Sequence, residues 1–299
     1  MAISPTDAHQ RLALLGRGAP RPAPPLFLPL CFTVAAGIEA VAPLDLALDE
    51  TKLVRAGSEL ARVTGQPALF TSIPTGAVAE ALGAELDLSS WPPRVTGRLA
   101  DVDLPAADPD RLAGASRLLA VGLSATRNLA ADEGNRLLPL VALEGPVALH
   151  RQLYGETPLT EARADALGAV LAALIAEYAK AGAEAVVLYD TPAGAEELEP
   201  VKAIYRTACN VARFHRRPLI AAGQLALGLP ALVQALAPEE TPGPMQKAHA
   251  RLWPETPETW AEVPFDPAAR IVLTRAEVPH DTALEQLFAL GAAALARFD

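Results

Sequence analysis

The sequence predicts an α/β fold, a (β/α)8 barrel of the TIM type. Short apolar segments with strand character alternate with amphipathic helices along the chain. Most of these segments are apolar throughout instead of alternating with polar residues, which is typical of parallel strands covered on both faces. Several of them end at a carboxylate or another polar residue, and the sites of parallel α/β folds lie at the carboxyl ends of the strands.

In the first half of the chain, Gly65 and Gly83 each end a predicted helix, and Asp108 followed by Pro109 begins one. The predicted helices cover residues 4–15, 50–64, 76–82 and 109–131. The predicted extended segments cover residues 26–34 and 68–73. We expect a Pro/Gly/Arg connector over 16–25 and a long excursion over 86–108.

In the second half, Thr160 caps a helix whose apolar stripe ends at Gly182, and the strand that follows ends at Asp190. The other predicted strands cover residues 138–143, 219–222 and 271–274. A short helix is predicted to begin after Pro146. The other predicted helices cover residues 196–216, 229–236 and 282–298. Residues 238–267 are rich in proline and poorly patterned. Because a closed barrel needs eight strands and the sequence offers fewer clear ones, we expect the barrel to be irregular or shortened in its last third.

The composition sets limits on the class of protein. The chain has 299 residues, 51% of them hydrophobic, and is expected to form a single barrel domain over 1–299, with 1–25 as an N-terminal extension. A net charge of −10 argues against a nucleic-acid partner. The two cysteines, Cys31 and Cys209, lie far apart, which favours a reducing cytoplasm over a disulfide scaffold. We expect no membrane partner, since no transmembrane or signal segment is found. A homodimer is compatible with the sequence.

The polar residues at the predicted strand ends are the candidates for chemistry. A carboxylate in an apolar cleft has a raised pKa and suits acid–base catalysis, so the candidate catalytic residues are Asp190, Glu144 and Glu277. The candidate substrate-binding residues are Ser72, His150, Arg151, Gln224 and Arg275. Structural roles remain open for several of them. Asp190 could cap the next helix or tie down a loop, His150 could lie on a helix surface, and Arg275 could pair with Glu277.

Four motifs of the chain occur in the order found in one known family. Residues 70–73 and 80–83 (E-A-L-G) are similar to an early strand and helix, and 144–149 are similar to a G-x-P-x-T-L turn. Residues 181–191 are similar to an A-G-A-D strand with a closing aspartate, and 278–285 are similar to a P-x-D-T-P-x-E helix start. With these motifs the chain resembles the uroporphyrinogen decarboxylase superfamily, from about residue 58 to the C-terminus. The resemblance implies a (β/α)8 barrel with its site at the carboxyl ends of the strands.

The superfamily holds porphyrinogen decarboxylases and zinc-dependent methyltransferases that act between corrinoids and thiols. The arginine-rich loop of the decarboxylases corresponds here to 31–37, which has no arginine, and their essential aspartate falls on Ser72. The zinc-ligand positions of the methyltransferases fall on Ile220, Ala222 and Ala276. None of these can supply the thiolate or imidazole that zinc prefers. We therefore expect no bound metal and no tightly bound cofactor.

Three functions follow as hypotheses. The first is a methyltransferase-like enzyme that acts on a small methylated compound or a corrinoid, whose partner would be that small molecule or a corrinoid protein. The second is a divergent uroporphyrinogen decarboxylase, a carboxy-lyase of porphyrin biosynthesis. The third is a non-catalytic barrel that binds a tetrapyrrole or serves as a partner subunit. Resemblance in fold does not decide among them.

Overall fold

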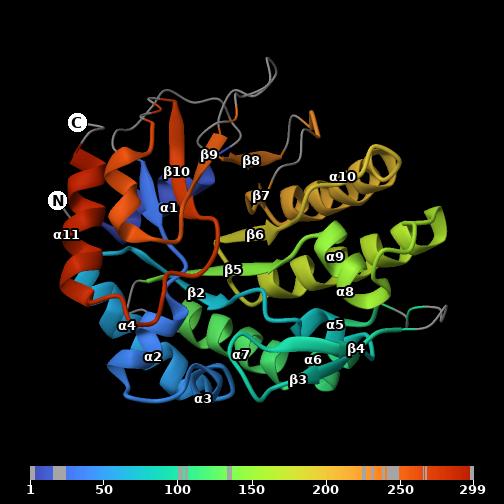
Figure 1. Cartoon of the computed structure of the whole chain (residues 1–299), viewed down its shortest axis with the longest axis horizontal. Coiled ribbons are helices and arrows are strands. Elements are labelled where there is room, and N and C mark those ends of the chain that lie inside the picture. The colour runs from blue at the N-terminus through green and yellow to red at the C-terminus, as the bar shows by residue number, and fades with distance from the viewer. Residues whose placement is uncertain are drawn as a thin grey trace.

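Eight parallel strands form a nearly closed barrel surrounded by helices in the computed structural model (Figure 1). The structure describes residues 4–15, 25–99, 104, 107–132, 137–223, 227–229, 232–237, 240, 249–264, 266 and 268–296. The barrel strands are β1 (Leu26–Leu28), β2 (Ala68–Ser72), β5 (Leu138–Glu144), β6 (Ala185–Tyr189), β7 (Leu219–Ala222), β8 (Val233–Leu236), β9 (His249–Trp253) and β10 (Ala269–Thr274).

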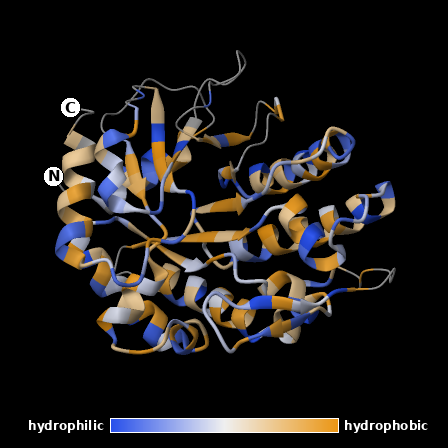
Figure 2. Cartoon of the chain, viewed as in Figure 1, coloured by the Kyte–Doolittle hydropathy of each residue, from blue (hydrophilic) through white to orange (hydrophobic). Residues whose placement is uncertain are grey.

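The order of strands around the barrel is β1-β10-β9-β8-β7-β6-β5-β2, and every neighbouring pair is parallel. Within the described residues, no ladder of hydrogen bonds joins β1 to β2, so the barrel has a seam between these two strands. The predicted barrel is confirmed. Most strand residues are hydrophobic, as the orange colour in Figure 2 shows, because side chains fill the interior and helices cover the outside.

The helices around the barrel begin and end at the residues that the sequence marks. Asp49 and Thr160 accept hydrogen bonds from the first turns of α4 and α9, and Gly65 ends α4 in the left-handed conformation. The helices are α1 (Pro5–Ala13), α2 (Phe32–Ile38), α3 (Pro43–Ala47), α4 (Glu50–Thr64), α5 (Ala77–Ala81), α6 (Pro109–Ala115), α7 (Arg117–Ala131), α8 (Pro146–Tyr154), α9 (Glu161–Lys180), α10 (Leu198–Phe214) and α11 (Leu284–Leu295), with a 3-10 helix η1 (Pro257–Glu262).

The helix α1 packs at the amino ends of the strands. Its Ala8 and Leu12 are buried in the core, and His9 pairs with Glu184 at 2.9 Å. Because Glu184 directly precedes β6 and also binds Arg217, just before β7, this contact fixes α1 to the end of the barrel opposite the predicted site. Within the described part of the chain, no helix is both long and apolar enough to cross a membrane.

In its last third the barrel is not shortened, although the register between β9 and β10 is irregular near Ala269 and Ile271. Residues 233–236, predicted as part of a helix, form β8, and residues 249–253 form β9 within the segment predicted to be poorly patterned. The segment around β8 is buried between its neighbouring strands. It is too short for the spacing of its apolar residues to distinguish a helix from a strand. The charge on β9 is compensated, because the Arg251 guanidinium binds Asp266 at 2.5 Å and the carbonyls of Ala237 and Glu240.

Two further boundaries differ from the prediction. The extended segment ends at β1, because residues from Phe32 onward form α2. The helix expected over 109–131 is broken at Ser116, whose backbone is extended (φ −133°, ψ 120°) and whose hydroxyl caps α7. The excursion over 86–108 contains a two-stranded hairpin, β3 (Glu85–Asp87) and β4 (Arg94–Gly97), which lies beside α5 and outside the barrel sheet (Figure 1).

Candidate active site

The parallel strands bring the predicted residues to one end of the barrel. Ser72 and Glu144 are the last residues of β2 and β5, Asp190 follows β6, and Arg275 follows β10, with Glu277 two residues further on. The carboxyl ends of parallel strands share one face of a barrel. These five residues therefore lie on the face where the resemblance expects a site. Gln224 lies outside the described residues.

Asp190 holds the start of a neighbouring helix. Its Oδ1 accepts hydrogen bonds from the N–H of Ala148 (2.8 Å), the third residue of α8, and from the N–H of Thr191 (3.0 Å). Its Oδ2 accepts one from the hydroxyl of Tyr205 on α10 (3.0 Å). Burial raises the pKa of Asp190 to about 6, and these hydrogen bonds oppose the rise. The helix that Asp190 caps is thus α8, which precedes it in the chain, and not the next one.

Glu144 is buried, and its Oε1 accepts a hydrogen bond from the N–H of Gly76 at 2.5 Å. Gly76 is the residue that begins α5, in the left-handed conformation (φ 77°) that suits glycine. The Gln152 side chain donates a further hydrogen bond to Glu144. Burial raises the pKa of Glu144, although these donors favour the charged form.

Glu277 joins three parts of the chain. Its Oε1 accepts a hydrogen bond from the N–H of Thr33, the second residue of α2, and its Oε2 accepts one from the indole N–H of Trp91 at 3.0 Å. The Thr33 hydroxyl in turn donates to the carbonyl of Val278. Burial raises the pKa of Glu277, and the hydrogen bonds from Trp91 and Thr33 oppose it.

The three carboxyl groups share one arrangement. Each lies at or just beyond the end of one strand and accepts a backbone hydrogen bond at the start of the helix that follows an adjacent strand. Helix N-termini carry free N–H groups and a partial positive charge, so they stabilise a buried carboxylate. The arrangement fixes the βα loops at the barrel mouth, and all three carboxyl groups keep a raised pKa, which for Asp190 is about 6.

His150 lies on α8 and is buried, and neither of its ring nitrogens has a hydrogen-bond partner among the residues that the structure describes. Its ring is tilted against Tyr154, with 5.4 Å between centroids. Burial, and then the charge of Arg163, lower the pKa of His150. The surface position considered for His150 is therefore wrong. Arg151, its neighbour, donates to the Thr191 hydroxyl (2.9 Å) and lies 3.5 Å from Glu197, so it fixes the loop after Asp190.

Ser72 and Arg275 make other contacts. Ser72 is partly buried beside Tyr178 of α9 and Gly122 of α7. Arg275 is exposed, and its backbone N–H donates to the Trp253 carbonyl at 2.7 Å.

Three residues at the barrel mouth are not among the candidate site residues. The Tyr189 hydroxyl donates to the carbonyl of Thr274 at 3.0 Å, which links β6 to β10 across the three strands between them and so crosses the barrel interior. The Cys31 thiol is buried near this ring, and burial, followed by the charge of Glu277, raises its pKa. Trp91 comes from the turn of the β3–β4 hairpin. The one sequence feature that could have indicated a role for Trp91 is the presence of an aromatic residue in a Pro-rich segment.

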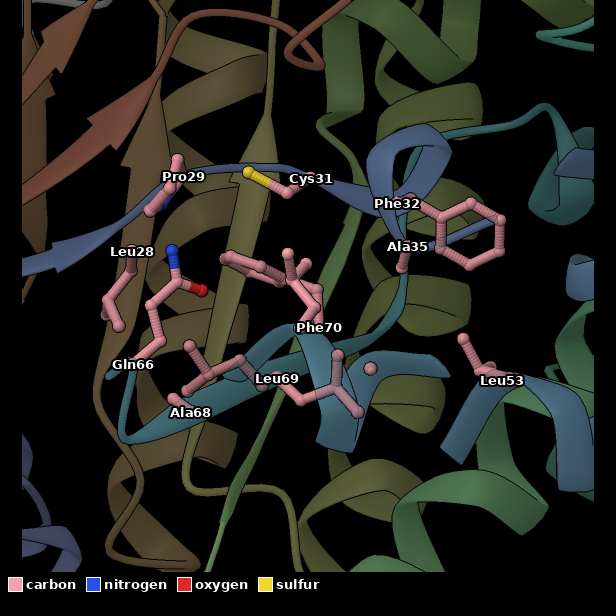
Figure 3. Close-up of a pocket in the computed structure, with 13 residues that line it drawn as sticks. Leu28, Pro29, Cys31, Phe32, Ala35, Leu53, Gln66, Ala68, Leu69 and Phe70 are labelled. Carbon is pink, nitrogen blue, oxygen red and sulfur yellow. The ribbon is translucent and has the colours of Figure 1, made fainter. Parts of the chain in front are cut away.

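A small apolar cavity of about 20 Å³ lies at the seam between β1 and β2. Figure 3 shows its lining, with the Cys31 sulfur and the Gln66 amide among apolar side chains such as Leu28, Leu69 and Phe70. The space is enough for about one water molecule. The cavity marks where the barrel is left open.

Among the residues that the structure describes, no group of three or more His, Cys, Asp or Glu side chains is arranged to hold a metal ion. Ile220 and Ala222, at two of the positions where the resemblance places zinc ligands, are buried apolar residues of β7. The side chains present at these positions do not fit a zinc centre of that kind.

Comparison with known proteins supports the barrel. No protein-family model matches this sequence, and a comparison with curated proteins found no match. A solved structure of a methyltransferase from Methanosarcina mazei is similar with a TM-score of 0.70 at 15% sequence identity, over 97% of this chain and 99% of that one. A putative vitamin-B12-independent methionine synthase from Listeria monocytogenes has a TM-score of 0.49 at 12% identity, over 94% of this chain and 99% of that one.

Proposed function

We propose that this protein is a methyltransferase-like barrel that binds a small methylated compound or a corrinoid at the carboxyl ends of its strands. The observation that carries the proposal is a set of three carboxyl groups, the buried Glu144 and the partly buried Asp190 and Glu277, all with raised pKa values and all on that face. Groups of this kind gather at functional sites more often than elsewhere. The likeness in fold to a methyltransferase and the ordered sequence motifs support the same assignment.

Asp190 is the residue we expect to serve a ligand. A group with a pKa of about 6 changes its protonation near neutral pH, and the carboxyl can exchange a proton while Tyr205 and the start of α8 hold it in place. Zinc is not part of the proposal, because the positions that would bind it hold Ile220, Ala222 and Ala276.

One observation favours a second candidate, the non-catalytic barrel. Each of the three carboxyl groups already accepts hydrogen bonds from the backbone at the start of a helix, which is a sufficient structural reason for its presence. On this alternative the mouth binds a tetrapyrrole without changing it. The decarboxylase hypothesis gains no comparable support, because Arg151 is bound to Thr191 and lies against Glu197.

A two-step experiment separates the candidates. Hydroxocobalamin and methylcobalamin are titrated into the protein and followed by visible absorbance, and methylcobalamin is then incubated without oxygen with 2-mercaptoethanol while thioether formation is measured. Binding with thioether formation above the protein-free rate supports the enzyme. Binding without it supports the non-catalytic barrel. Absence of binding contradicts a corrinoid ligand and leaves small methylated compounds to be tested in the same thioether assay.

A further inference from the structure

Trp91 contacts the barrel mouth in the way that a bound aromatic ligand contacts its site. The indole ring stacks on Phe32 with 5.2 Å between centroids and 8° between the planes, and its N–H donates to Glu277 at 3.0 Å. A flat ring placed on an aromatic face, with its N–H aimed at a carboxylate, combines stacking with a charge-assisted hydrogen bond. Proteins recognise heterocycles through the same two interactions.

The receiving side of this contact comes from elements outside the hairpin. Phe32 lies at the start of α2, and Glu277 is held by the Thr33 N–H through its other oxygen. Oε2 therefore has a fixed position and one donor from the hairpin. When the indole leaves, an aromatic face and a carboxylate oxygen remain, and the oxygen lacks a partner. That is a costly state unless a ligand or water replaces the indole.

The inserting side is exposed at its tip, and Pro93 is the buried residue just before β4. Trp91 lies in the turn between β3 and β4, where Leu88, Ser89 and Ser90 are exposed. The base of the hairpin is anchored elsewhere, since Leu86 and Val95 rest against Gly76 and the N–H of Leu99 donates to the Leu153 carbonyl. A two-stranded hairpin is marginally stable by itself, so its turn can leave the mouth while its base stays in place.

We propose that Phe32 and Glu277 form a binding slot for a flat aromatic heterocycle with a ring N–H, and that Trp91 fills this slot in the free protein as a built-in competitor. The ligand class is that of indole, benzimidazole and related bicyclic rings. The slot shares Glu277 with the face proposed above for a corrinoid, but its tests use indole and Cys31 labelling instead of cobalamin, so the two proposals fail separately. Ligand entry displaces the β3–β4 turn and opens the mouth next to Cys31.

The test uses the full chain with Trp91→Ala and isothermal titration calorimetry. Indole is expected to bind the variant with one site per chain, and about tenfold or more tightly than it binds the wild type, in which Trp91 competes. The probe 1-methylindole is expected to bind the variant about tenfold or more weakly than indole, since it cannot donate to Glu277. Leu88→Ala, an exposed change in the same turn, is the matched control and should bind indole as the wild type does.

A second measurement reports on the turn without a ligand. In a Cys209→Ala background, Cys31 is the remaining thiol, and its reaction with a disulfide reagent measures opening of the mouth. Labelling is expected to be slowest in the wild type, faster in Trp91→Phe, which keeps a ring but loses the N–H, and fastest in Trp91→Ala. Indole should slow labelling of the alanine variant. If that variant does not fold, Trp91→Phe decides the question.

Three results would overturn the proposal. One is an equal affinity of the alanine variant for indole and 1-methylindole. Another is indole binding that does not change between wild type and Trp91→Ala. The third is a Cys31 labelling rate that is the same in the wild type and Trp91→Phe. A failure of cobalamin to bind would bear only on the proposed function.

Discussion

The backbone N–H of Ala148 donates a 2.8 Å hydrogen bond to Oδ1 of Asp190, which ties the start of α8 to the end of β6. The same residue therefore serves a structural role and carries a pKa near neutrality. Gly145 makes this approach possible, because a Cβ at that position would lie 2.4 Å from Cγ of Asp190. The predictions below separate the structural role from a ligand role.

The change Asp190→Asn should alter how stability depends on pH. The pKa of Asp190 is raised from 3.8 to about 6, so between these values the folded state binds the proton more tightly than the unfolded state. The stabilisation that comes from protonated Asp190 is fully present below pH 3.8. It is lost as pH rises through the folded-state pKa of about 6. A pKa that differs by one between the folded and unfolded states corresponds to about 1.4 kcal/mol, so the wild type should lose about 3 kcal/mol relative to the variant between about pH 4 and pH 7.

Urea unfolding at a series of pH values measures this difference. Asparagine keeps the size of the side chain and an oxygen for the Ala148 N–H, so the fold should be retained. A wild-type-minus-variant difference that is flat over this range would show that Asp190 does not have a raised pKa in the folded protein.

The change Gly145→Ala should displace Asp190 from the start of α8. The new Cβ would meet both Cβ and Cγ of Asp190 within 2.5 Å, and neither atom is the far end of a flexible side chain. We expect a loss of about 1–3 kcal/mol in the free energy of unfolding, the range for overpacking a filled site. Gly114→Ala in α6 is the matched control, because no atom lies within 4 Å of the Cβ that alanine would add there and alanine favours a helix by about 1 kcal/mol. Urea unfolding of both variants makes the comparison, and an equal or higher stability of Gly145→Ala would contradict the close approach of Asp190.

The change His150→Phe should make the protein more resistant to acid. Burial, followed by the charge of Arg163, lowers the pKa of His150 below 6.5, so the unfolded state takes up the proton first as pH falls. The wild type should therefore lose up to about 1.4 kcal/mol per pH unit just below pH 6.5, whereas the variant should not. Thermal melts between about pH 5 and pH 8 measure the effect. Identical acid sensitivity in both proteins would contradict a buried neutral histidine at this position.

Much of the barrel follows from the sequence, because strands such as β5 and β6 are long, apolar and followed by marked helix starts. The strands β8 and β9 were missed for physical reasons. The first is short and buried on both faces, which does not distinguish a strand from a helix turn. The second carries Arg251, whose charge is compensated by Asp266, 15 residues away in the sequence.

The candidate site was predicted only in part. The rule that polar residues gather at the carboxyl ends of parallel strands placed Glu144, Asp190 and Glu277 on one face. Their hydrogen-bond donors could not be predicted. The N–H groups of Gly76, Ala148 and Thr33 lie at the starts of helices that follow neighbouring strands, and no local sequence pattern encodes such contacts. The same is true of Trp91, which is 186 residues away from Glu277 in the sequence.

The central claim is that the carboxyl ends of the strands form the ligand-binding face. Hydrogen–deuterium exchange, measured by mass spectrometry with and without methylcobalamin, tests it most directly. We predict slower exchange in the segments that follow β5 and β6, around residues 144–150 and 190–197, and unchanged exchange in α1 at the opposite end of the barrel. Protection confined to α1 and the amino ends of the strands, or no protection at saturating methylcobalamin, would contradict the claim for a corrinoid ligand.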